Sequence, residues 1–339
     1  MKEVKFGVQL PIWDPTYIPK PRQNPHGTLY YKIAKPNPKI TLKIAQEADK
    51  QGYDSIWVID HLSKLPDNHM FECWTTMTWL AALTSKIRVG SLVMCPLYRH
   101  PTILAKMCST FDVLSNGRLE LGLGACAVGS KMETAPRGIK WYGPKNRIEI
   151  LEETIQILKE LWTKEETNYS GKHFQLDKAS CTPKPVQRPH PPITIAGWGE
   201  KLGLRAVARY ADRSNFGFVP LEMIEHKLGV LKNHCDSVGR DYDSITKSAE
   251  IGVIIHPTYE EYVEEMKKRF DYNVGEGSFE EWMVDAERCF ITGTPDMCLE
   301  QLEEYVDLGL SYFMIRFGDF PDLDGMRLFQ KEVAPTYNR

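Results

Sequence analysis

Eight short apolar runs recur along the 339-residue chain, and segments with the spacing of amphipathic helices separate them. Parallel strands need such helices between them, because each crossover must return the chain to the same end of the sheet. The alternation therefore predicts an α/β fold, and eight strands are the number that closes a (β/α)8 TIM barrel. The expected strands span residues 5–10, 55–59, 87–93, 119–123, 193–196, 214–219, 248–255 and 312–316.

A doubly wound sheet is the alternative arrangement of the same elements. A sheet of that kind that binds a dinucleotide carries a glycine-rich phosphate loop directly after its first strand. Here a Pro-Ile-Trp-Asp-Pro segment begins at residue 11 instead, and no G-x-G-x-x-G sequence opens a helix. The barrel is thus favoured, as one domain over residues 1–339. Its expected helices are 40–51, 73–85, 102–114, 147–162, 201–210, 222–238, 259–270 and 295–308.

Three segments interrupt the alternation, and we interpret them as insertions after strands 1 and 4 and before strand 5. Residues 11–38 are rich in proline and aromatic residues, residues 126–146 follow the fourth strand, and residues 164–192 include a hairpin-like stretch. Long loops in compact domains are often functional lids, although a proline-stiffened surface wrap explains the first insertion equally well. Residues 275–285 read as an interrupted crossover.

Composition and charge exclude several classes of partner. With 42% hydrophobic residues, 26% charged residues and a formal charge of −3, the chain has no basic excess that would attract nucleic acid. No apolar run reaches membrane-spanning length, and the histidines show no metal-ligand spacing. We therefore expect no membrane, no metal and a small-molecule partner.

The cysteine pattern bears on the cellular compartment. The eight cysteines form no C-x-x-C pair and mostly fall inside apolar or helical patterns. This distribution predicts free thiols in a reducing cytoplasm rather than a disulfide framework. The amino-terminal residues also lack the features of a signal peptide, so a cytoplasmic protein is expected.

Barrel enzymes carry their chemistry at the carboxyl ends of the strands, so the residues that follow each strand are the ones to inspect. These positions are rich in small and apolar residues and poor in charge, which suits a flat heteroaromatic ring. His61 follows the second strand, and an imidazole can exchange a proton near neutral pH. His61 is therefore the candidate catalytic residue, and the alternative is a histidine fixed by Asp60 that only shapes the pocket.

Four segments together resemble a known superfamily. They are GYDSIWVIDH (52–61), FECWTTMTWLAALTSKIRVGSLVMCPLYRHP (71–101), SNGRLELGLGA (115–125) and KPVQRPHPPITIAGWG (184–199). In order and spacing they are similar to the luciferase-like superfamily of flavin- and coenzyme F420-dependent oxidoreductases. The resemblance implies a TIM barrel, a histidine at position 61 near the reactive carbon of the cofactor, and a non-proline cis peptide at Leu92-Val93 that presses a bulge against the ring.

The resemblance and the strand-end positions together give a set of candidate cofactor-binding residues. Backbone donors at a helix amino terminus form a ready phosphate site, so the cofactor phosphate is assigned to residues 196–199. The small residues after the fourth strand are expected to lie beneath the ring. The full set is Asp60, Ser91, Leu92, Val93, Cys95, Gly124, Ala125, Ala127, Ala196, Gly197, Trp198, Gly199, Asn215 and Phe216.

Two departures from the family pattern concern the proton donor. Many deazaflavin dehydrogenases carry a glutamate shortly after the fourth strand, where this chain has Cys126 and Ala127, and some carry a tryptophan where Leu65 stands. This puts a sugar-phosphate substrate in doubt. Lys131 and Glu133 are nearby ionisable residues, but the sequence does not select between them. Glu72 reads as a carboxylate that favours a helix start.

The function implied by the resemblance is hydride transfer between coenzyme F420 and a small organic substrate. The first alternative is an FMN-dependent monooxygenase that receives reduced flavin from a flavin reductase. The second is a non-catalytic flavin-binding protein. A homodimer is compatible with the sequence, but the substrate, the redox direction and the oligomeric state do not follow from it.

Overall fold

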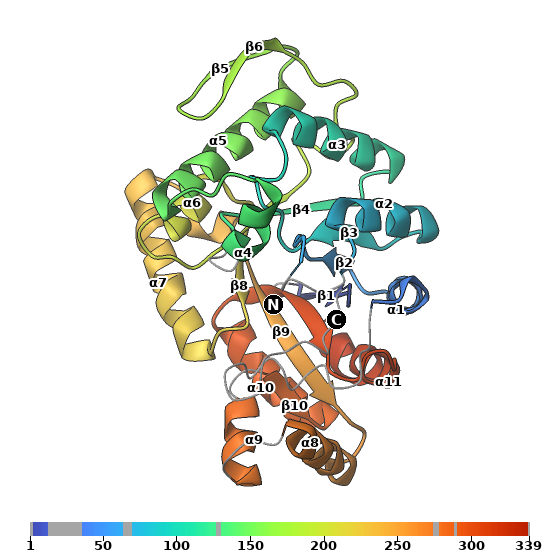
Figure 1. Ribbon diagram of the computed structural model, residues 1–339. Coiled ribbons are helices and arrows are strands. Elements are labelled where there is room, and N and C mark those ends of the chain that lie inside the picture. Colours follow the sequence, from blue (N-terminus) through green and yellow to red (C-terminus); the bar gives the residue numbers. More distant parts are fainter. Residues whose placement is uncertain are drawn as a thin grey trace.

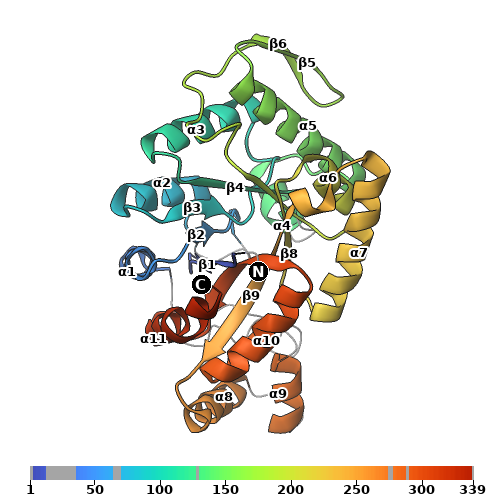
Figure 2. The same ribbon diagram turned by 180° about the vertical axis from the view of Figure 1, so that it is seen from behind.

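The computed structural model describes residues 3–12, 36–63, 70–126, 130–273, 278–287 and 290–337. A closed barrel of eight parallel strands forms its centre, as predicted, with helices on the outside (Figures 1 and 2). The strands follow one another around the barrel in chain order, and the last closes against the first. They are β1 (Lys5–Gln9), β2 (Ser55–Val58), β3 (Arg88–Ser91), β4 (Leu119–Gly124), β7 (Ile193–Ala196), β8 (Arg213–Gly217), β9 (Thr246–Ile255) and β11 (Leu310–Phe317).

A ninth parallel strand, β10 (Phe290–Gly293), was not predicted. It pairs with β9 outside the closed barrel. Strand β9 is ten residues long, so one of its edges has room for two neighbours. Strand β8 occupies that edge up to Glu250, and β10 takes it from Gly252 onward.

The eight predicted helices are all present, with ends that differ by a few residues. Proline in the first turn favours the start of α1, α3, α5 and α10, since its missing N–H has no partner there anyway. Three short or interrupted helices, α4, α9 and α11, were not predicted. The helices are α1 (Pro38–Gln51), α2 (Cys73–Leu83), α3 (Pro101–Leu114), α4 (Ser130–Thr134), α5 (Pro144–Thr163), α6 (Gly203–Tyr210), α7 (Leu221–Val238), α8 (Tyr259–Asn273), α9 (Phe279–Glu287), α10 (Pro295–Asp307) and α11 (Asp324–Leu328).

Strand side chains alternate between the helices and the barrel interior. The helix-facing set is apolar and belongs to one large core that includes Phe6 and Val8. The interior set is mostly polar, small or aromatic, with Met314 as an exception, and Trp57 lies across it. A Cβ atom at Gly7 or Gly90 would come within 2.5 Å of the Trp57 ring, so glycine on β1 and β3 gives the indole its space.

The three insertions have different outcomes. Most of the first, residues 13–35, lies outside the described residues. The second contains α4. The third forms the predicted hairpin, β5 (Thr167–Ser170) and β6 (Gln175–Ala179), which projects from α5 away from the barrel (Figure 1). Its turn is held by Glu153 of α5, which accepts hydrogen bonds from the amides of residues 172–174.

Candidate active site

Asp60 follows β2 at the carboxyl end of the barrel, and it is buried. Its carboxylate accepts two hydrogen bonds from the Arg99 guanidinium, at 2.7 and 3.1 Å, and one from the Cys95 amide at 3.0 Å. Arg99 also contacts Glu72, which caps α2 through the amides of Trp74 and Thr75. The described contacts of Asp60 therefore fix the loop after β3 beside His61, and the helix-start reading of Glu72 is confirmed.

His61 is bonded to a carboxylate that the sequence did not select. Its Nδ1 lies 2.7 Å from Oε1 of Glu133, which projects from α4 and is only 3% exposed. Oε2 of Glu133 accepts hydrogen bonds from the amides of Leu62 and Ser63. Burial alone would raise the pKa of Glu133, but the hydrogen bonds with His61 and the two amides outweigh burial and lower it.

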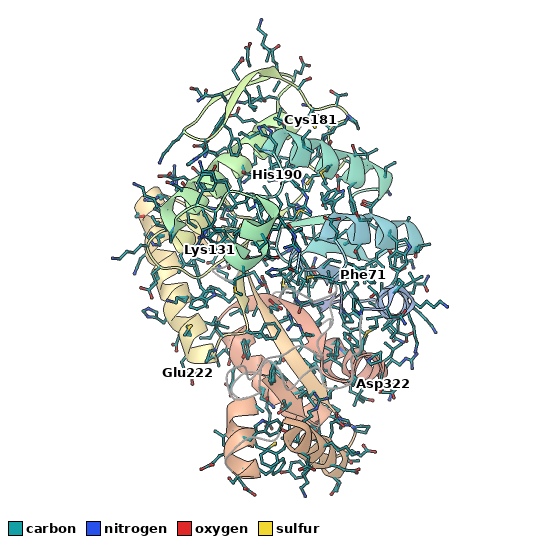
Figure 3. All side chains as sticks on the ribbon, in the orientation of Figure 1. Phe71, Lys131, Cys181, His190, Glu222 and Asp322 are labelled. Carbon is teal, nitrogen blue, oxygen red and sulfur yellow. A yellow bond between two sulfur atoms is a disulfide. The ribbon has the colours of Figure 1, made fainter. Side chains whose placement is uncertain are left out.

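This geometry fixes the tautomer of the histidine. An ionised carboxylate can only accept, so the Nδ1–H of His61 donates to Glu133 and Nε2 is the nitrogen left to exchange a proton. Of the two ionisable residues that the sequence left open, Lys131 and Glu133, it is Glu133 of α4 that contacts the histidine. Lys131, on the same short helix, is exposed (Figure 3).

The peptide bond between Leu92 and Val93 is cis, as the family resemblance implied. Ser91 ties this segment to β4, because its hydroxyl donates to the Gly122 carbonyl and accepts from the Gly122 amide. The Val93 side chain then lies over the β4 glycines, with its methyl carbons 2.8 and 2.7 Å from where Cβ atoms of Gly122 and Gly124 would be. Gly122 and Gly124 therefore leave room for the side chain of Val93, which we call the Val93 ridge. The ridge covers this face of Gly124.

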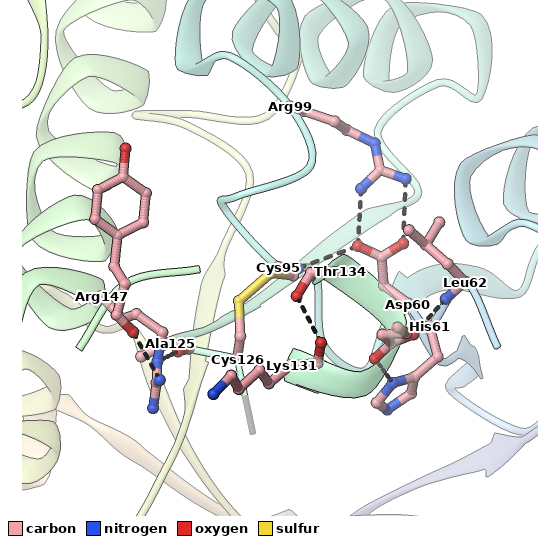
Figure 4. Close-up of a disulfide and its surroundings, with 12 residues drawn as sticks. Asp60, His61, Leu62, Cys95, Arg99, Ala125, Cys126, Lys131, Thr134 and Arg147 are labelled. Carbon is pink, nitrogen blue, oxygen red and sulfur yellow. Dashed lines mark hydrogen bonds and ion pairs between the residues drawn. A yellow bond between two sulfur atoms is a disulfide. The ribbon is translucent and has the colours of Figure 1, made fainter. Parts of the chain in front are cut away.

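A disulfide joins the loops after β3 and β4, between Cys95 and Cys126, as Figure 4 shows with Asp60 and His61 nearby. The prediction that all thiols are free is therefore wrong for these two residues. Their separation of 31 residues matches no local motif, and the parallel pairing of β3 with β4 brings the two loops together, with the Cα atoms 5.3 Å apart. Five other cysteines are free and buried, and burial raises the pKa of one of them, Cys298, to about 12.

The segment after β7 is open, as a phosphate site requires. Gly197 has φ of 142°, and an added Cβ there would meet no atom within 4 Å. Within the described part of the chain, the amides of residues 198–202 donate no hydrogen bond before α6 begins. Trp198 is 44% exposed, which is unusual for an indole at a strand end. Of the residues predicted for the phosphate, Trp198 and Gly199 thus have free amides, whereas the Gly197 amide donates to the Asn215 carbonyl at 3.5 Å.

The remaining predicted residues divide by the face of the strand they occupy. Arg213 points into the barrel, where it stacks on Tyr312, so Asn215 faces inward and Phe216 faces the helices. Phe216 is 1% exposed in the helix-facing core, and its assignment to the cofactor was wrong because strand parity was not considered. Ala196 and Ala125 are partly buried at the strand ends, and the Ala125 carbonyl accepts from Arg147. Ala127 lies outside the described residues.

A polar cluster on the barrel floor was missed by the sequence analysis. Arg316 of β11 donates from Nε to the Gln9 side-chain oxygen at 2.5 Å and from Nη2 to Glu250 at 2.7 Å. Burial lowers the pKa of Arg316 well below its usual range. The signal was available, since each of these residues interrupts an apolar strand with a polar or charged side chain.

The described residues also bear on metal binding and on membrane insertion. No group of three or more His, Cys, Asp or Glu side chains placed to hold a metal ion occurs in the described ranges. No described helix is both long and apolar enough to cross a bilayer.

The parallel barrel and a carboxylate–histidine pair at its carboxyl end define a barrel oxidoreductase of the luciferase type, and sequence comparison agrees. The luciferase-like monooxygenase family model matches residues 20–312, and the chain belongs to this family. An F420-dependent glucose-6-phosphate dehydrogenase from Segniliparus rotundus is 28% identical over 88% of this chain and 94% of its own. A second such dehydrogenase, from Mycobacterium avium, is 27% identical over 89% of this chain and 95% of its own.

Solved structures share the fold at lower identity. An F420-dependent secondary alcohol dehydrogenase, solved with an F420-acetone adduct, superposes with a TM-score of 0.76 at 20% identity and 99% coverage of both chains. A long-chain alkane monooxygenase superposes with a TM-score of 0.77 at 17% identity, covering 100% of this chain and 92% of its own. The fold thus accommodates both dehydrogenases and monooxygenases.

Proposed function

We propose that this protein transfers a hydride between coenzyme F420 and a small organic substrate, with His61 as the proton donor or acceptor. The observation that carries the proposal is the hydrogen bond between His61 and the buried Glu133 at the carboxyl end of the barrel. The relatives at 28% and 27% identity are F420-dependent dehydrogenases, which supports the cofactor.

The residues at the strand ends fit a ring cofactor with an anionic tail. The Val93 ridge offers a rigid apolar surface for a ring, and the open amides of residues 198–202 offer donors for a phosphate. When bound, the deazaflavin ring would supply a carbon that accepts or gives a hydride. These are the residues that would hold it, and no metal is needed in the proposal.

The protein groups would manage the proton that accompanies the hydride. Glu133 accepts the Nδ1–H of His61 and orients the ring, so that Nε2 can hold a proton for the substrate oxygen or take one from it. Oxidation of an alcohol to a carbonyl releases one proton and one hydride, and His61 accounts for the proton. The substrate of the glucose-6-phosphate dehydrogenases is not carried over, because Leu65 stands where some of them have tryptophan.

The second candidate is an FMN-dependent monooxygenase, favoured by the structural similarity to the long-chain alkane monooxygenase. Such an enzyme would receive reduced flavin from a partner reductase. The third candidate is a flavin-binding protein without catalysis. Such a protein would use the Val93 ridge to bind the ring but would not require His61.

Fluorescence quenching with F420 and with FMN tests the cofactor directly. We expect F420 to bind at micromolar concentration or tighter and FMN to bind more weakly. Tight FMN binding with no detectable F420 binding would remove the F420 assignment.

Replacement of His61 tests the chemistry. His61→Ala should lower turnover by roughly 10²–10⁴-fold, the usual contribution of general acid–base catalysis, while F420 affinity stays within severalfold. Unchanged turnover at saturating substrate would reduce His61 to a wall residue, and oxygen-dependent product formation would favour the monooxygenase.

A further inference from the structure

The Gln9 side chain is a buried amide whose orientation the structure determines. Gln9 is 1% exposed, and its oxygen accepts the Nε–H of Arg316. The reversed amide would place two donors against each other, because Arg316 has no acceptor. The amide nitrogen is therefore the group that points away from Arg316, and it can only donate.

This donor has no acceptor in the described part of the chain. Nε2 of Gln9 is fully buried without a hydrogen-bond partner. A buried amide N–H without an acceptor lowers the stability of the protein by roughly 1–3 kcal/mol. We therefore expect the working protein to bind an acceptor for it. Other buried polar atoms without partners include hydroxyls such as that of Ser214, which faces the helices, and Arg213 Nε, which stacks on Tyr312 at the opposite end of the barrel.

The position of Gln9 points to a ligand. It is the last residue of β1, and it faces the barrel interior because it alternates with Gly7, which contacts Trp57 there. Gln9 pairs in register with Trp57 on the neighbouring strand β2. His61 lies four residues after Trp57, just beyond the end of that strand. Gln9 therefore lies at the floor of the barrel mouth, below the rim that carries His61, where barrel enzymes bind their ligands.

The charge on this floor selects the chemistry of the acceptor. Arg316 is paired with Glu250 at 2.7 Å, and Gln9 itself is neutral. An anion buried next to the Glu250 carboxylate would be disfavoured, whereas an uncharged oxygen only has to accept. We infer that Gln9 is a ligand-binding residue and that its amide donates a hydrogen bond to an uncharged carbonyl or hydroxyl oxygen.

Two sources could present that oxygen: the organic substrate or a ring carbonyl of the cofactor. The inference rests on the proposed function for the identity of the ligand, but not for the existence of the donor. Nuclear magnetic resonance of protein labelled with ¹⁵N-glutamine observes the donor directly. The Gln9 side-chain signal is the one that disappears in Gln9→Glu, or in Gln9→Asn if the first variant does not fold.

Three probes are titrated separately: F420, acetone at high concentration, and inorganic phosphate. A downfield shift of the Gln9 amide proton with F420 identifies the cofactor carbonyl, and a shift with acetone identifies a substrate oxygen. For the probe that shifts the signal, Gln9→Glu should lower the affinity by about tenfold, which corresponds to the loss of one hydrogen bond. Gln330→Glu is the matched control, because Gln330 lies in the 329–333 segment that packs on the helix-facing side of β1.

The outcomes separate this inference from the proposed function. A shift with acetone in a protein that does not quench F420 fluorescence would support the Gln9 donor and overturn the F420 assignment. A shift with phosphate alone would overturn the uncharged acceptor. A Gln9 signal that none of the three probes moves would overturn the inference altogether.

Discussion

The barrel interior holds a charged cluster at each end, and the two differ in how their groups are partnered. At the amino end, Glu120 accepts from Arg88 at 2.5 Å and from Arg213 at 3.0 Å, and Arg213 also reaches Thr194. At the carboxyl end, Arg316 joins Gln9 to Glu250. Along β11 the interior side chains run Tyr312, Met314 and Arg316, so aromatic and apolar groups separate the clusters.

Each cluster has one buried donor without an acceptor among the described residues, but Nε of Arg213 belongs to a guanidinium that stacks on Tyr312, whereas the Gln9 amide lies below the rim that carries His61. Both oxygens of Glu120 are used, the Arg213 guanidinium stacks 4.0 Å from the Tyr312 ring centre, and Tyr312 and Trp57 both donate to the Ser55 hydroxyl. The carboxyl end has the Gln9 donor without an acceptor and a partly exposed His61. Similar residue types thus form an ion-pair cluster at one end and, in our proposal, a ligand-binding site at the other.

The largest expected effect is the loss of the amino-end cluster. Glu120→Leu leaves Arg88 and Arg213 without their shared carboxylate, and breaking a buried ion pair in this way costs about 3–5 kcal/mol of unfolding free energy. Urea unfolding measures the loss, and F420 affinity of the folded fraction should stay within severalfold. The exposed Glu166→Leu is the control, with a change of about 0.5 kcal/mol or less. Equal stability of both variants would remove the contrast between the two ends.

Much of this fold could be predicted from sequence, because each strand is an apolar run bounded by turn residues. The hydrophobic period specifies which segments are strands, and parity within a strand specifies the face. Phe216 shows the limit: its neighbours Asn215 and Gly217 face the interior, and parity becomes readable only once one residue is anchored. Strand β10 is as short as β2, β3 and β7, which were predicted, but it lies outside the closed barrel, so the expected count of eight strands was complete without it.

The contacts that make the site were beyond the sequence because they join distant positions. Glu133 is 72 residues from His61, and Cys126 is 31 residues from Cys95. Both depend on where the short helix α4 and the loop after β4 come to lie, and five helical residues give too weak a periodicity to predict. His61 could be selected as a candidate because it follows a strand end, whereas the cis bond at Leu92-Val93 was expected only from the family resemblance.

The next effect concerns the disulfide, which gives the carboxyl end a stabilising link of its own. Cys126→Ser opens a loop of 31 residues, which in the chain-entropy treatment removes roughly 3–4 kcal/mol of unfolding free energy as an upper value. Thermal unfolding with and without a reductant measures it. Wild type in reductant should match the variant, and the variant should not respond to reductant. A variant as stable as oxidised wild type would show that the link does not stabilise this end.

A smaller effect in free energy, but a larger one in function, is expected for Glu133. In Glu133→Gln the single amide oxygen is needed by the Leu62 and Ser63 amides, so the NH2 group faces His61 and can no longer accept the Nδ1–H, and turnover should fall by roughly 10²–10³-fold. The pH profile of turnover should also move, which a purely structural role would not cause. Lys131→Ala, an exposed change on the same helix, is the control and should leave both unchanged. An unaltered pH profile in Glu133→Gln would show that Glu133 does not influence the proton transfer.

The smallest effect is the pH dependence of stability, and it tests whether both ends hold ionised carboxylates. Burial raises the pKa of Glu120, but the charges of Arg213 and Arg88 outweigh burial and lower it, and the pKa of Glu133 is also lowered. A carboxylate with a lowered folded pKa stabilises the fold above its unfolded value of 4.5, and the stabilisation is lost as the pH falls through the folded pKa. Wild-type unfolding free energy should therefore decline below about pH 4.5.

Each glutamine variant should remove its own share of that decline. Glu120→Gln and Glu133→Gln are less stable at neutral pH, and each should lose less on acidification than wild type. The double variant should be close to additive, because the two carboxylates lie at opposite ends of the barrel and share no partner. Urea unfolding at several pH values between 7 and about 3.5 measures the three slopes. A Glu120→Gln slope equal to that of wild type would mean that Glu120 is not the ionised centre of the amino-end cluster, and the two ends would then differ less than their hydrogen bonds indicate.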